Sequence, residues 1–347
     1  MKTNSELTLS NEEKLTLLGQ LIDMRCFQTA ALREYNAGHM AGFLILSVGQ
    51  EGLAVAAKSL MQPDDHLICG VRSLSYALAC GMSMEGLMAE LFGKSSGCAH
   101  GKGGMFGFFA PQLHFHGGYA CAGTQTPLGT GIAFALKYQQ KKGIALCVLG
   151  DGATDQGAFH EALNLASLFN LPIVFIIENN QYSIWTSTAR HVANKTDPLA
   201  QRAEGYNMDW DVVSDGSDIN SLRSSLYRAM ETARQQRRPV LLEVQTYRFY
   251  GFSIADGNSK KHRTAEEIKY HREHHDPLKN WSELLKQEGL LDDKTLKDYN
   301  LIARQKVEAA IRFAETAPSP QISDLTKHVY WEADQPHRTS QGALFFK

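Results

Sequence analysis

Acidic and amide side chains follow two apolar runs of the chain, at the point where each run ends. Residues 144–149 lead into Asp151, which stands between two glycines, and residues 171–177 lead into paired asparagines that end at Asn180. Short apolar runs between helical patterns are typical of buried parallel strands, whose carboxyl ends meet at one edge of a sheet. Open α/β sheets bind ligands at that edge. We therefore expect Asp151 and Asn180 to meet at a ligand site.

The residue types at these strand ends suit a divalent cation that carries a phosphate group. A carboxylate beside phosphate oxygens is favourable only where a cation lies between them, and Mg²⁺ prefers carboxylates, phosphate oxygens and water. Asp151, the Asn180 amide oxygen and a nearby carbonyl supply such ligands. Helical spacing over 154–170 predicts unpaired N–H groups beside them, which stabilise a diphosphate. Gly150 and Gly152 permit close backbone approach and unusual dihedral angles.

Either motif alone is more typical of a simple turn, since Gly-Asp-Gly and Asn-Asn are both common turn sequences. Their combination, one helix and one strand apart, favours the cation and diphosphate interpretation instead.

The elements that position these residues follow from the alternation of patterns along the chain. Apolar runs at 144–149, 171–177 and 240–244, and a short strand ending near Cys69, are separated by segments with helical spacing. This alternation predicts the α/β class with a doubly wound parallel sheet.

Helical extensions are expected on both sides of the sheet. Capping-box sequences at Ser10 and Thr264 predict helices that begin at these residues. The glycine-rich stretch 93–118 has no single period and is expected to be a long loop of functional importance. We expect three units: an N-terminal helical arm (1–40), an α/β domain (41–265), and C-terminal helices with a tail (266–347).

Composition excludes several classes of protein. The 347 residues are 43% hydrophobic and 21% charged, with a formal net charge of −2. These values are ordinary for a globular protein and give no reason to expect a nucleic acid or a membrane as partner. Six cysteines without a Cys-X-X-Cys pair favour reduced thiols, and the polar, acidic N-terminus lacks a targeting pattern. We expect a cytoplasmic protein.

The Gly-Asp-Gly and Glu-Asn-Asn motifs together resemble the thiamine-diphosphate signature. The surrounding sequences HGKGGMFG, TQTPLGTGIAFALKYQ, GDGATDQGAFHEALNLASLFNLPIVFIIENNQYSI and LLEVQTYRF resemble the alpha subunit of the two-chain 2-oxo acid dehydrogenase decarboxylases of the pyruvate, branched-chain and acetoin type. The resemblance extends from about Gly42 to Tyr330. It implies the thiamine-diphosphate-binding fold and a diphosphate-binding module.

The resemblance implies a role for each matching position. Asp151, Asn180 and the backbone carbonyl of Tyr182 would bind Mg²⁺, and the backbone of Gly152 and Ala153 would meet the diphosphate of thiamine diphosphate.

Three further residues match cofactor positions at some distance along the chain. Arg72 falls where the family grips the diphosphate with a tyrosine-arginine pair, although its neighbour here is Val71. A guanidinium group is well shaped for diphosphate oxygens. Ala120 and Ala122 match positions that flank the pyrimidine end of the cofactor.

Phe252 is the most informative departure from the family. It stands where the family has a cofactor-facing histidine that helps handle the substrate carboxylate, and phenylalanine cannot donate a proton or a hydrogen bond. Ile45 and Leu74 also replace histidines of pyruvate-type members. Either the substrate or acceptor is altered, or activity is lost, or another group substitutes. The candidate substitutes are His100, His114, His116 and the hydroxyl of Tyr250.

The resemblance implies an oxidoreductase subunit that needs a second chain. A separate beta subunit supplies the glutamate near the pyrimidine ring, in an alpha2beta2 assembly, and the acyl group passes to a lipoyl domain of an acyltransferase or to a carrier protein. Two alternatives stay open: transketolase-like transfer of two carbons to a carrier protein, and a non-catalytic cofactor-binding assembly subunit. Because of Phe252, we predict slow or absent turnover of pyruvate with a lipoyl acceptor.

Overall fold

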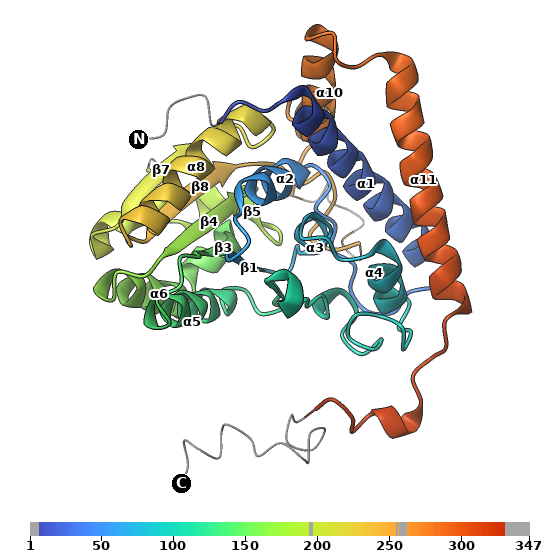
Figure 1. Ribbon diagram of the computed structural model, residues 1–347, viewed down its shortest axis with the longest axis horizontal. Coiled ribbons are helices and arrows are strands. Elements are labelled where there is room, and N and C mark those ends of the chain that lie inside the picture. The colour runs from blue at the N-terminus through green and yellow to red at the C-terminus, as the bar shows by residue number, and fades with distance from the viewer. Residues whose placement is uncertain (1–6, 194–196, 255, 257–261, 330–347) are drawn as a thin grey trace.

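A parallel β-sheet forms the centre of the molecule (Figure 1). The computed structural model describes residues 7–193, 197–254, 256 and 262–329. Over this part of the chain the main sheet has six strands in the order β2-β1-β3-β4-β8-β7, and every neighbouring pair is parallel. The strands are β1 (His66–Cys69), β2 (Phe115–Gly118), β3 (Ala145–Gly150), β4 (Ile173–Asn179), β7 (Asp209–Val213) and β8 (Val240–Gln245). The predicted α/β class with a doubly wound parallel sheet is confirmed.

The four strands predicted from apolar runs are β1, β3, β4 and β8, which occupy the middle of the sheet. The two edge strands carry no such signal. β2 lies inside the glycine-rich stretch that was expected to be a loop, and β7 alternates charged and apolar residues. Edge strands have only one neighbour and bury less surface, so their sequences are less constrained to be apolar.

Helices cover both faces of the sheet (Figure 1). Helices α2 (Glu51–Leu60) and α8 (Ile219–Gln235) pack on one face, and α5 (Gln125–Tyr138) and α6 (Gly157–Leu168) on the other. Leu146 and Val148 of β3 face the first core, whereas Cys147 and Leu149 face the second. This alternation follows from the two-residue period of a strand and explains why the central strands read as continuous apolar runs.

A second group of helices packs beside the sheet. It comprises α1 (Asn11–Asn36), α3 (Leu74–Ala79), α4 (Met84–Leu91), α9 (Ala265–His274), α10 (Pro277–Gln287) and α11 (Asp293–Thr316). Arg25 of α1 forms ion pairs with Glu51 of α2 at 2.6 Å and with Asp276, the N-cap of α10, at 2.9 Å. Buried residues of α1 and α11 belong to the same apolar core as α2 and α8, so these two helices pack onto the domain that carries the sheet.

Hydrogen bonds at the N-caps agree fully with one predicted capping box and partly with the other. Ser10 forms the full capping box with Glu13, as expected. Thr264 accepts a hydrogen bond from the Glu267 backbone at 3.0 Å, but the Glu267 side chain bonds the hydroxyls of Tyr182 and Tyr247 instead of returning to the cap. The three-unit division stays a prediction, and its last 18 residues, 330–347, lie outside the described residues.

Short elements connect the larger ones. They are the hairpin strands β5 (Tyr182–Ser183) and β6 (Thr186–Ser187), helix α7 (Thr188–His191), and the 3₁₀ helices η2 (Gly104–Phe106), η3 (Pro111–Leu113), η4 (Asp151–Asp155), η5 (Leu199–Tyr206) and η7 (Ile322–Asp324). Among the described residues, no helix combines the length and apolar character that a membrane span requires.

The strand order reverses between β1 and β3. From β1 the chain continues to β2 on one side, whereas β3 pairs with the other side of β1 and leads on to β4. The loops that leave the carboxyl ends of two such strands diverge, which opens a crevice where ligands bind in sheets of this kind.

Candidate functional site

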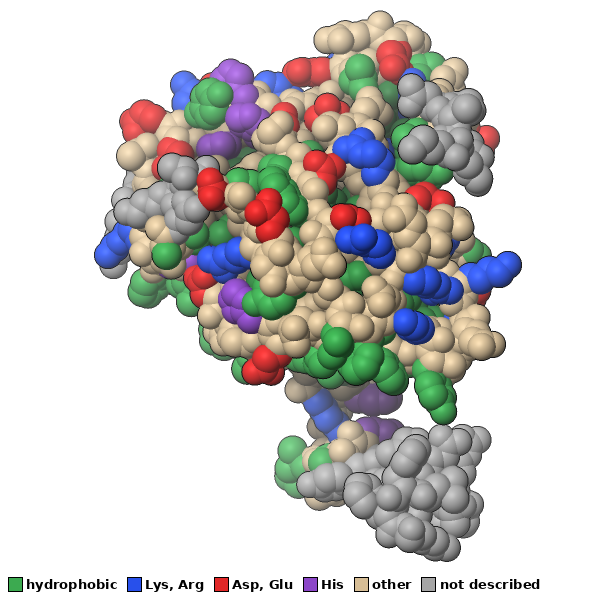
Figure 2. Space-filling view, turned by 90° about the vertical axis from the view of Figure 1, so that its left-hand side faces the viewer, with side chains coloured by type: hydrophobic (Ala, Val, Ile, Leu, Met, Phe, Trp, Pro, Cys, Tyr) green, Lys and Arg blue, Asp and Glu red, His purple; other side chains and the backbone are tan. Residues whose placement is uncertain are grey.

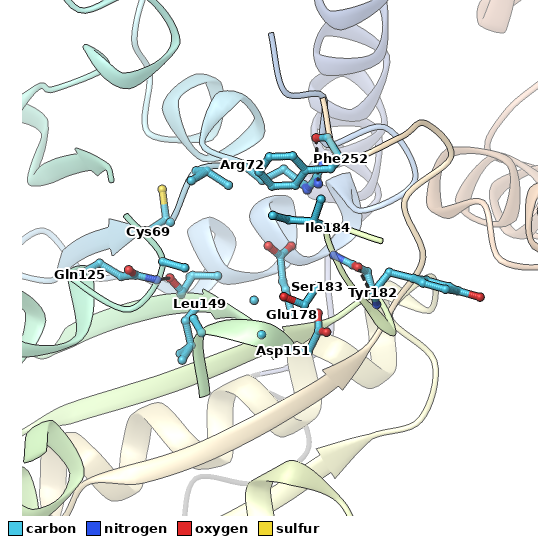
Figure 3. Close-up of a pocket in the computed structure, with 18 of the residues that line it drawn as sticks. Cys69, Arg72, Gln125, Leu149, Asp151, Glu178, Tyr182, Ser183, Ile184 and Phe252 are labelled. Carbon is cyan, nitrogen blue, oxygen red and sulfur yellow. Dashed lines mark hydrogen bonds between the residues drawn. The ribbon is translucent and has the colours of Figure 1, made fainter. Parts of the chain in front are cut away.

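A cavity of about 310 Å³ lies at the carboxyl ends of β1, β3 and β4, where the strand order reverses (Figure 3). Its lining includes all nine residues predicted to contact the cofactor: Arg72, Ala120, Ala122, Asp151, Gly152, Ala153, Asn180, Tyr182 and Phe252. These residues come from five separate segments of the chain. The structure therefore brings together residues that are spread over about 180 positions of the sequence.

Asp151 and Asn180 follow neighbouring strands that are in register. Gly150 pairs with Glu178 across the β3–β4 ladder, so the residues that follow both strands emerge side by side. The Asp151 side chain is buried, with 1% of the residue exposed, and its Oδ2 has distant contacts at 3.5 Å with Thr188 and His191. Two oxygen ligands for a cation, the Asp151 carboxylate and the Asn180 amide oxygen, thus face one cavity.

The turn after β3 differs from the prediction. A helix was expected from residue 154, but Asp151–Asp155 form the 3₁₀ helix η4 and α6 begins at Gly157. Thr154 is responsible, because its hydroxyl donates a 2.6 Å hydrogen bond to the Asp151 carbonyl and tightens the turn. The backbone N–H groups nearest the cavity belong to η4 and not to the first turn of α6.

The two glycines beside Asp151 serve different purposes. A Cβ atom added to Gly152 would lie 2.1 Å from the Ser183 hydroxyl oxygen, so the backbone must approach β5 closely. Gly150 has open space around it and ordinary extended angles, φ −80° and ψ 163°. The predicted close approach applies to Gly152, and the predicted unusual dihedral angle at Gly150 is wrong.

Three buried guanidinium groups surround the cavity region. Arg72, Arg248 and Arg263 are 8%, 1% and 2% exposed, and each donates hydrogen bonds to backbone carbonyls. Within the described ranges none of the three forms an ion pair, and the Nε atoms of Arg248 and Arg263 have no partner. Burial lowers the pKa of Arg72 to about 10 and that of Arg248 to about 9. Buried cations without counter-ions are costly, so a bound anion would stabilise this arrangement.

Glu178 is a cavity residue to which the sequence assigned no role. Figure 3 shows its carboxyl group pointing into the cavity. Burial raises the pKa of Glu178 to about 7, although Tyr76, Arg72 and Gln50 each favour the ionised form. In the described part of the chain, the Tyr76 hydroxyl and the Gln50 amide have no hydrogen-bond partner. The cavity therefore contains polar groups that remain available to a ligand.

His191 was also missed, because nothing in its surrounding sequence marks it. Its Nδ1 lies 2.6 Å from Asp155 and its Nε2 lies 3.5 Å from Asp151. The Asp151 and Asp155 carboxylates raise the pKa of His191, and Asp151 contributes most. The imidazole lies beside the Asp151 carboxylate on the side of α7, but in the described part of the chain its hydrogen bond is to Asp155 and its Nε2 has no partner.

Apolar side chains form the opposite part of the cavity. Phe252, Ile184 and Val71 line it, and Figure 3 shows the Phe252 ring beside Arg72. The Phe252 carbonyl accepts a hydrogen bond from Arg72 at 3.4 Å, so the polar contact of Phe252 with the guanidinium comes from its backbone. Ile45 and Leu74 are buried in the core and do not line the cavity.

The four candidate substitutes for the family histidine do not line the cavity. His114 and His116 lie beside His66, the first residue of β1. His66 pairs with the first residue of β3, so all three histidines lie at the amino ends of the strands. His116 Nε2 is 2.7 Å from His66 Nδ1. They therefore stand at the edge of the sheet opposite to the cavity.

The other two candidates are engaged elsewhere. His100 is exposed and stacks on His328 with ring centroids 4.6 Å apart. The Tyr250 ring lies under the Arg272 guanidinium at 5.4 Å, and its carbonyl accepts hydrogen bonds from two of the buried arginines. The catalytic assignments to these residues have no support in this chain's geometry.

No group of three closely spaced His, Cys, Asp or Glu side chains borders the cavity; among the described residues, the one such group is Glu34, His39 and Glu315. A Mg²⁺ site with phosphate and water ligands requires fewer side chains than that, and typically uses one or two carboxylates. Asp151, the Asn180 amide and the Tyr182 backbone carbonyl match this smaller requirement.

The sequence is similar to one protein family over most of its length. A family model described as "Dehydrogenase E1 component" matches residues 20–323. The chain is 37% identical over 320 residues to the pyruvate dehydrogenase E1 component subunit alpha of Zymomonas mobilis, which covers 92% of this chain and 88% of that protein. The subunit of the same name from Rhizobium meliloti is 35% identical over 316 residues, covering 91% and 89%. The human somatic, mitochondrial form is 35% identical over 332 residues, covering 94% and 82%.

Proposed function

The chain belongs to the dehydrogenase E1 component family, and we propose that it works as the subunit that binds Mg²⁺ and the diphosphate of thiamine diphosphate. It is an alpha-type subunit of a 2-oxo acid dehydrogenase, and members of that family depend on thiamine diphosphate. The reaction that we propose is decarboxylation of a 2-oxo acid, followed by transfer of the acyl group to a lipoyl thiol of a carrier.

One observation carries the assignment of the diphosphate position. Arg72 is buried, lines the cavity and forms no ion pair with a carboxylate among the described residues, and the backbone of η4 lines the same cavity. A diphosphate would supply the missing negative charge, and a divalent cation would allow it to lie beside Asp151. The close contact of Gly152 with Ser183 brings backbone N–H groups of η4 to the same place.

We propose that Asp151, Asn180 and the Tyr182 carbonyl hold Mg²⁺, and that Arg72 and the backbone of Gly152 and Ala153 hold the diphosphate. Thiamine diphosphate supplies the carbanion chemistry when it is bound. The chain itself orients the cofactor and excludes water through Phe252, Ile184 and Val71. Ala120 and Ala122 are small enough to leave room for the pyrimidine end.

A beta-type partner chain is implied by the family, and we propose an alpha2beta2 assembly. The carboxylates that line the cavity are Asp151 and Glu178, and both lie at the strand ends near the proposed cation. Among the described residues no further carboxylate lines the cavity, and we propose that the group that activates the pyrimidine comes from the beta-type partner. A lipoyl domain is the acceptor that we propose.

The two alternative functions are not favoured. The relatives described above carry the name of one dehydrogenase subunit and span most of this chain, which gives no support to carrier-directed two-carbon transfer. The buried Asp151 and the unpaired Arg72 also argue against a subunit that has lost its cofactor site.

The Asp151→Asn variant tests the proposal directly. This change keeps the size of the side chain but removes the charged Mg²⁺ ligand. Because loss of a residue that only supports a ligand costs about 10–100-fold in metal affinity, loss of the ligand itself should weaken Mg²⁺-dependent binding of thiamine diphosphate at least about 100-fold. Calorimetric titration of the full-length chain together with its beta-type partner measures this change.

Asp155→Asn is the matched control. Asp155 lies in the same turn, but it pairs with Arg202 and His191 and does not line the cavity. We expect near-normal cofactor affinity in that variant. Equal affinities of wild type and Asp151→Asn, with circular dichroism unchanged, would show that the cation is bound elsewhere.

A further inference from the structure

Tyr76 is a cavity residue to which the proposed function gives no role. It lies in α3 and lines the cofactor cavity, and the residue is 1% exposed. Its hydroxyl has no hydrogen-bond partner in the described part of the chain. A buried hydroxyl without a partner is unfavourable, so native proteins rarely keep one unless a water or a ligand completes it.

The other buried polar atoms near the cavity differ from the Tyr76 hydroxyl in chemistry or in place. Among the described residues, Tyr76 and Gln125 carry the buried side-chain atoms that line the cavity without a hydrogen-bond partner. The Gln125 atom is the amide oxygen, which only accepts hydrogen bonds, whereas the Tyr76 hydroxyl can donate one. Ser73 and Gln50 also have unpartnered buried atoms, but neither residue lines the cavity. Of these four side chains, Tyr76 alone offers a free donor to a ligand there.

The Tyr76 hydroxyl keeps its proton. Burial raises the pKa of Tyr76 well above its usual value, and the neighbouring Glu178 carboxyl raises it further. At neutral pH the group is thus a hydrogen-bond donor and not a phenolate. The donor shares the cavity with the Arg72 guanidinium, which is buried without an ion pair in the described ranges, and with the backbone of η4. A negatively charged acceptor would satisfy all three.

We propose that the Tyr76 hydroxyl donates a hydrogen bond to the diphosphate of thiamine diphosphate. This inference rests on the proposed function and adds one residue to it. The anionic diphosphate is the strongest acceptor that the cofactor carries. Val71, which precedes Arg72 in the chain, lines the cavity but has no polar side-chain atom. Tyr76 therefore supplies, from α3, a donor that this neighbour of Arg72 lacks.

The principal rival acceptor is the Glu178 carboxyl group, which lines the same cavity. If the Tyr76 hydroxyl served only Glu178, it would stabilise the protein without cofactor, and its removal would lower the melting temperature. If the hydroxyl instead serves a ligand, its removal relieves the cofactor-free protein of an unpaired buried group and raises the melting temperature. The sign of this change separates the two roles.

Tyr76→Phe removes the hydroxyl and keeps the ring. We expect the Mg²⁺-dependent affinity for thiamine diphosphate to fall about 10- to 100-fold, because a hydrogen bond to a charged group is lost. The affinity for inorganic diphosphate with Mg²⁺ should fall by the same factor. The melting temperature of the cofactor-free protein should rise by about 1–3 °C. Titration and scanning calorimetry of the full-length chain with its beta-type partner measure these changes.

Tyr247→Phe is the matched control. Tyr247 is also 1% exposed, but its hydroxyl donates a 2.8 Å hydrogen bond to Glu267 and the residue does not line the cavity. This variant should bind the cofactor as the wild type does and melt at a lower temperature, because a satisfied hydrogen bond is lost.

Three results would overturn the inference while leaving the proposed function intact. The first is equal cofactor affinity in the wild type and Tyr76→Phe. The second is a lower melting temperature of cofactor-free Tyr76→Phe, which would assign the hydroxyl to Glu178. The third is weaker binding of thiamine diphosphate with unchanged binding of inorganic diphosphate, which would place the hydroxyl at another part of the cofactor. A wild type that binds no thiamine diphosphate would contradict the proposed function, and the inference with it.

Discussion

Adjacent residues at the end of β4 have different roles. The Asn179 amide donates to Glu243 at 2.7 Å and its oxygen accepts from the Gln181 backbone, so its side chain is fully used within the sheet. Asn180 instead lines the cavity. Asn180 follows the strand, and its amide oxygen accepts a 3.3 Å hydrogen bond from the Tyr182 backbone, so one asparagine is fixed within the sheet and the next one stands at the cavity.

Substitution of Phe252 tests whether this residue limits the turnover of pyruvate. Its ring lines the cavity near Arg72, and none of the candidate substitutes reaches that place. The predicted slow turnover of pyruvate follows, because a missing proton donor typically costs 10²–10⁴-fold. We expect Phe252→His to raise kcat for pyruvate at least about tenfold in the complex reconstituted with a beta-type partner and a lipoyl domain, measured as release of CO₂.

Phe252→Leu serves as the control, since it opens the same space without supplying a proton donor. Its pyruvate rate should stay at the wild-type level. A fast wild-type rate with pyruvate, left unchanged by Phe252→His, would mean that the histidine is dispensable in this chain. Branched-chain 2-oxo acids and ketose donors, assayed in parallel, identify the substrate if pyruvate is slow.

The glycine-rich segment after α4 is held by one helical side chain. The Glu90 carboxylate is fully buried and accepts four backbone hydrogen bonds, from Ala99 and Gly101 at 2.8 and 2.9 Å and from Gly103 and Gly104 at 2.8 and 2.9 Å. A segment that looks like a flexible loop in the sequence is therefore ordered around a charge on a neighbouring helix.

Glu90→Gln should destabilise this segment strongly. The amide NH₂ group would face backbone N–H donors that have no other acceptor, and each buried donor left unpaired costs about 1–3 kcal/mol. We expect the free energy of unfolding in urea to fall by about 2–4 kcal/mol. In Glu85→Gln, an exposed change in the first turn of the same helix, the free energy of unfolding should fall by less than about 0.5 kcal/mol. Equal effects of the two changes would contradict this account.

The histidines at the amino ends of the strands make stability depend on pH. Burial, and the nearby His114, His116 and Lys141, lower the pKa of His66 to about 4. The unfolded chain binds this proton near pH 6.5, whereas the folded chain does not bind it until about pH 4. Protonation therefore favours the unfolded state, and stability should fall as the pH drops from 6.5 to 4 and change little below that through this group.

Urea unfolding at pH 7 and pH 5 measures this dependence. In His66→Gln the loss of stability between these two pH values should be smaller than in the wild type. His274→Gln removes an exposed histidine and should leave the loss unchanged. A loss in His66→Gln as large as in the wild type would assign the pH dependence to other groups.

At the scale of the whole molecule, an apolar surface covers the C-terminal parts of α5 and α6. Phe134 and Tyr138 of α5 and Leu168 of α6 are 47%, 81% and 66% exposed, and Figure 2 shows hydrophobic side chains gathered along the lower edge of the body, where these helices lie. Gln125, the first residue of α5, lines the cavity. Phe134 and Tyr138 lie toward the other end of α5, and exposed apolar patches mark protein interaction sites. We propose that the beta-type partner implied by the family covers this surface.

Leu168→Glu should therefore weaken assembly with the partner. A charge in a buried apolar interface is costly, and we expect the dissociation constant to rise at least about tenfold. Sedimentation of the mixed chains measures it. Leu301→Glu places the same charge at an exposed leucine of α11, 55% exposed, and should not affect assembly. If Leu301→Glu disrupted assembly and Leu168→Glu did not, the interface would lie at α11 instead of α5 and α6.

The sequence by itself determined the α/β class, the four central strands and the meeting of Asp151 and Asn180 at one sheet edge, while the resemblance to the family supplied Arg72, Ala120, Ala122 and Phe252. These features are local, because a buried central strand must be apolar on both faces and because Asp151 and Asn180 directly follow such strands. The sequence could not reveal the edge strand β2, the 3₁₀ start of the turn at Asp151, or the roles of Glu178 and His191.

Only the tertiary structure decided how groups far apart in the chain meet. Arg72, Arg248 and Arg263 become a cluster of buried charge only when segments far apart in the chain pack together. His114 and His116 lie away from the site because the amino end of β2 stands at the sheet edge opposite to the cavity. Periodicity and turn chemistry act over a few neighbouring residues, whereas desolvation and the pairing of charges depend on every segment that surrounds a group.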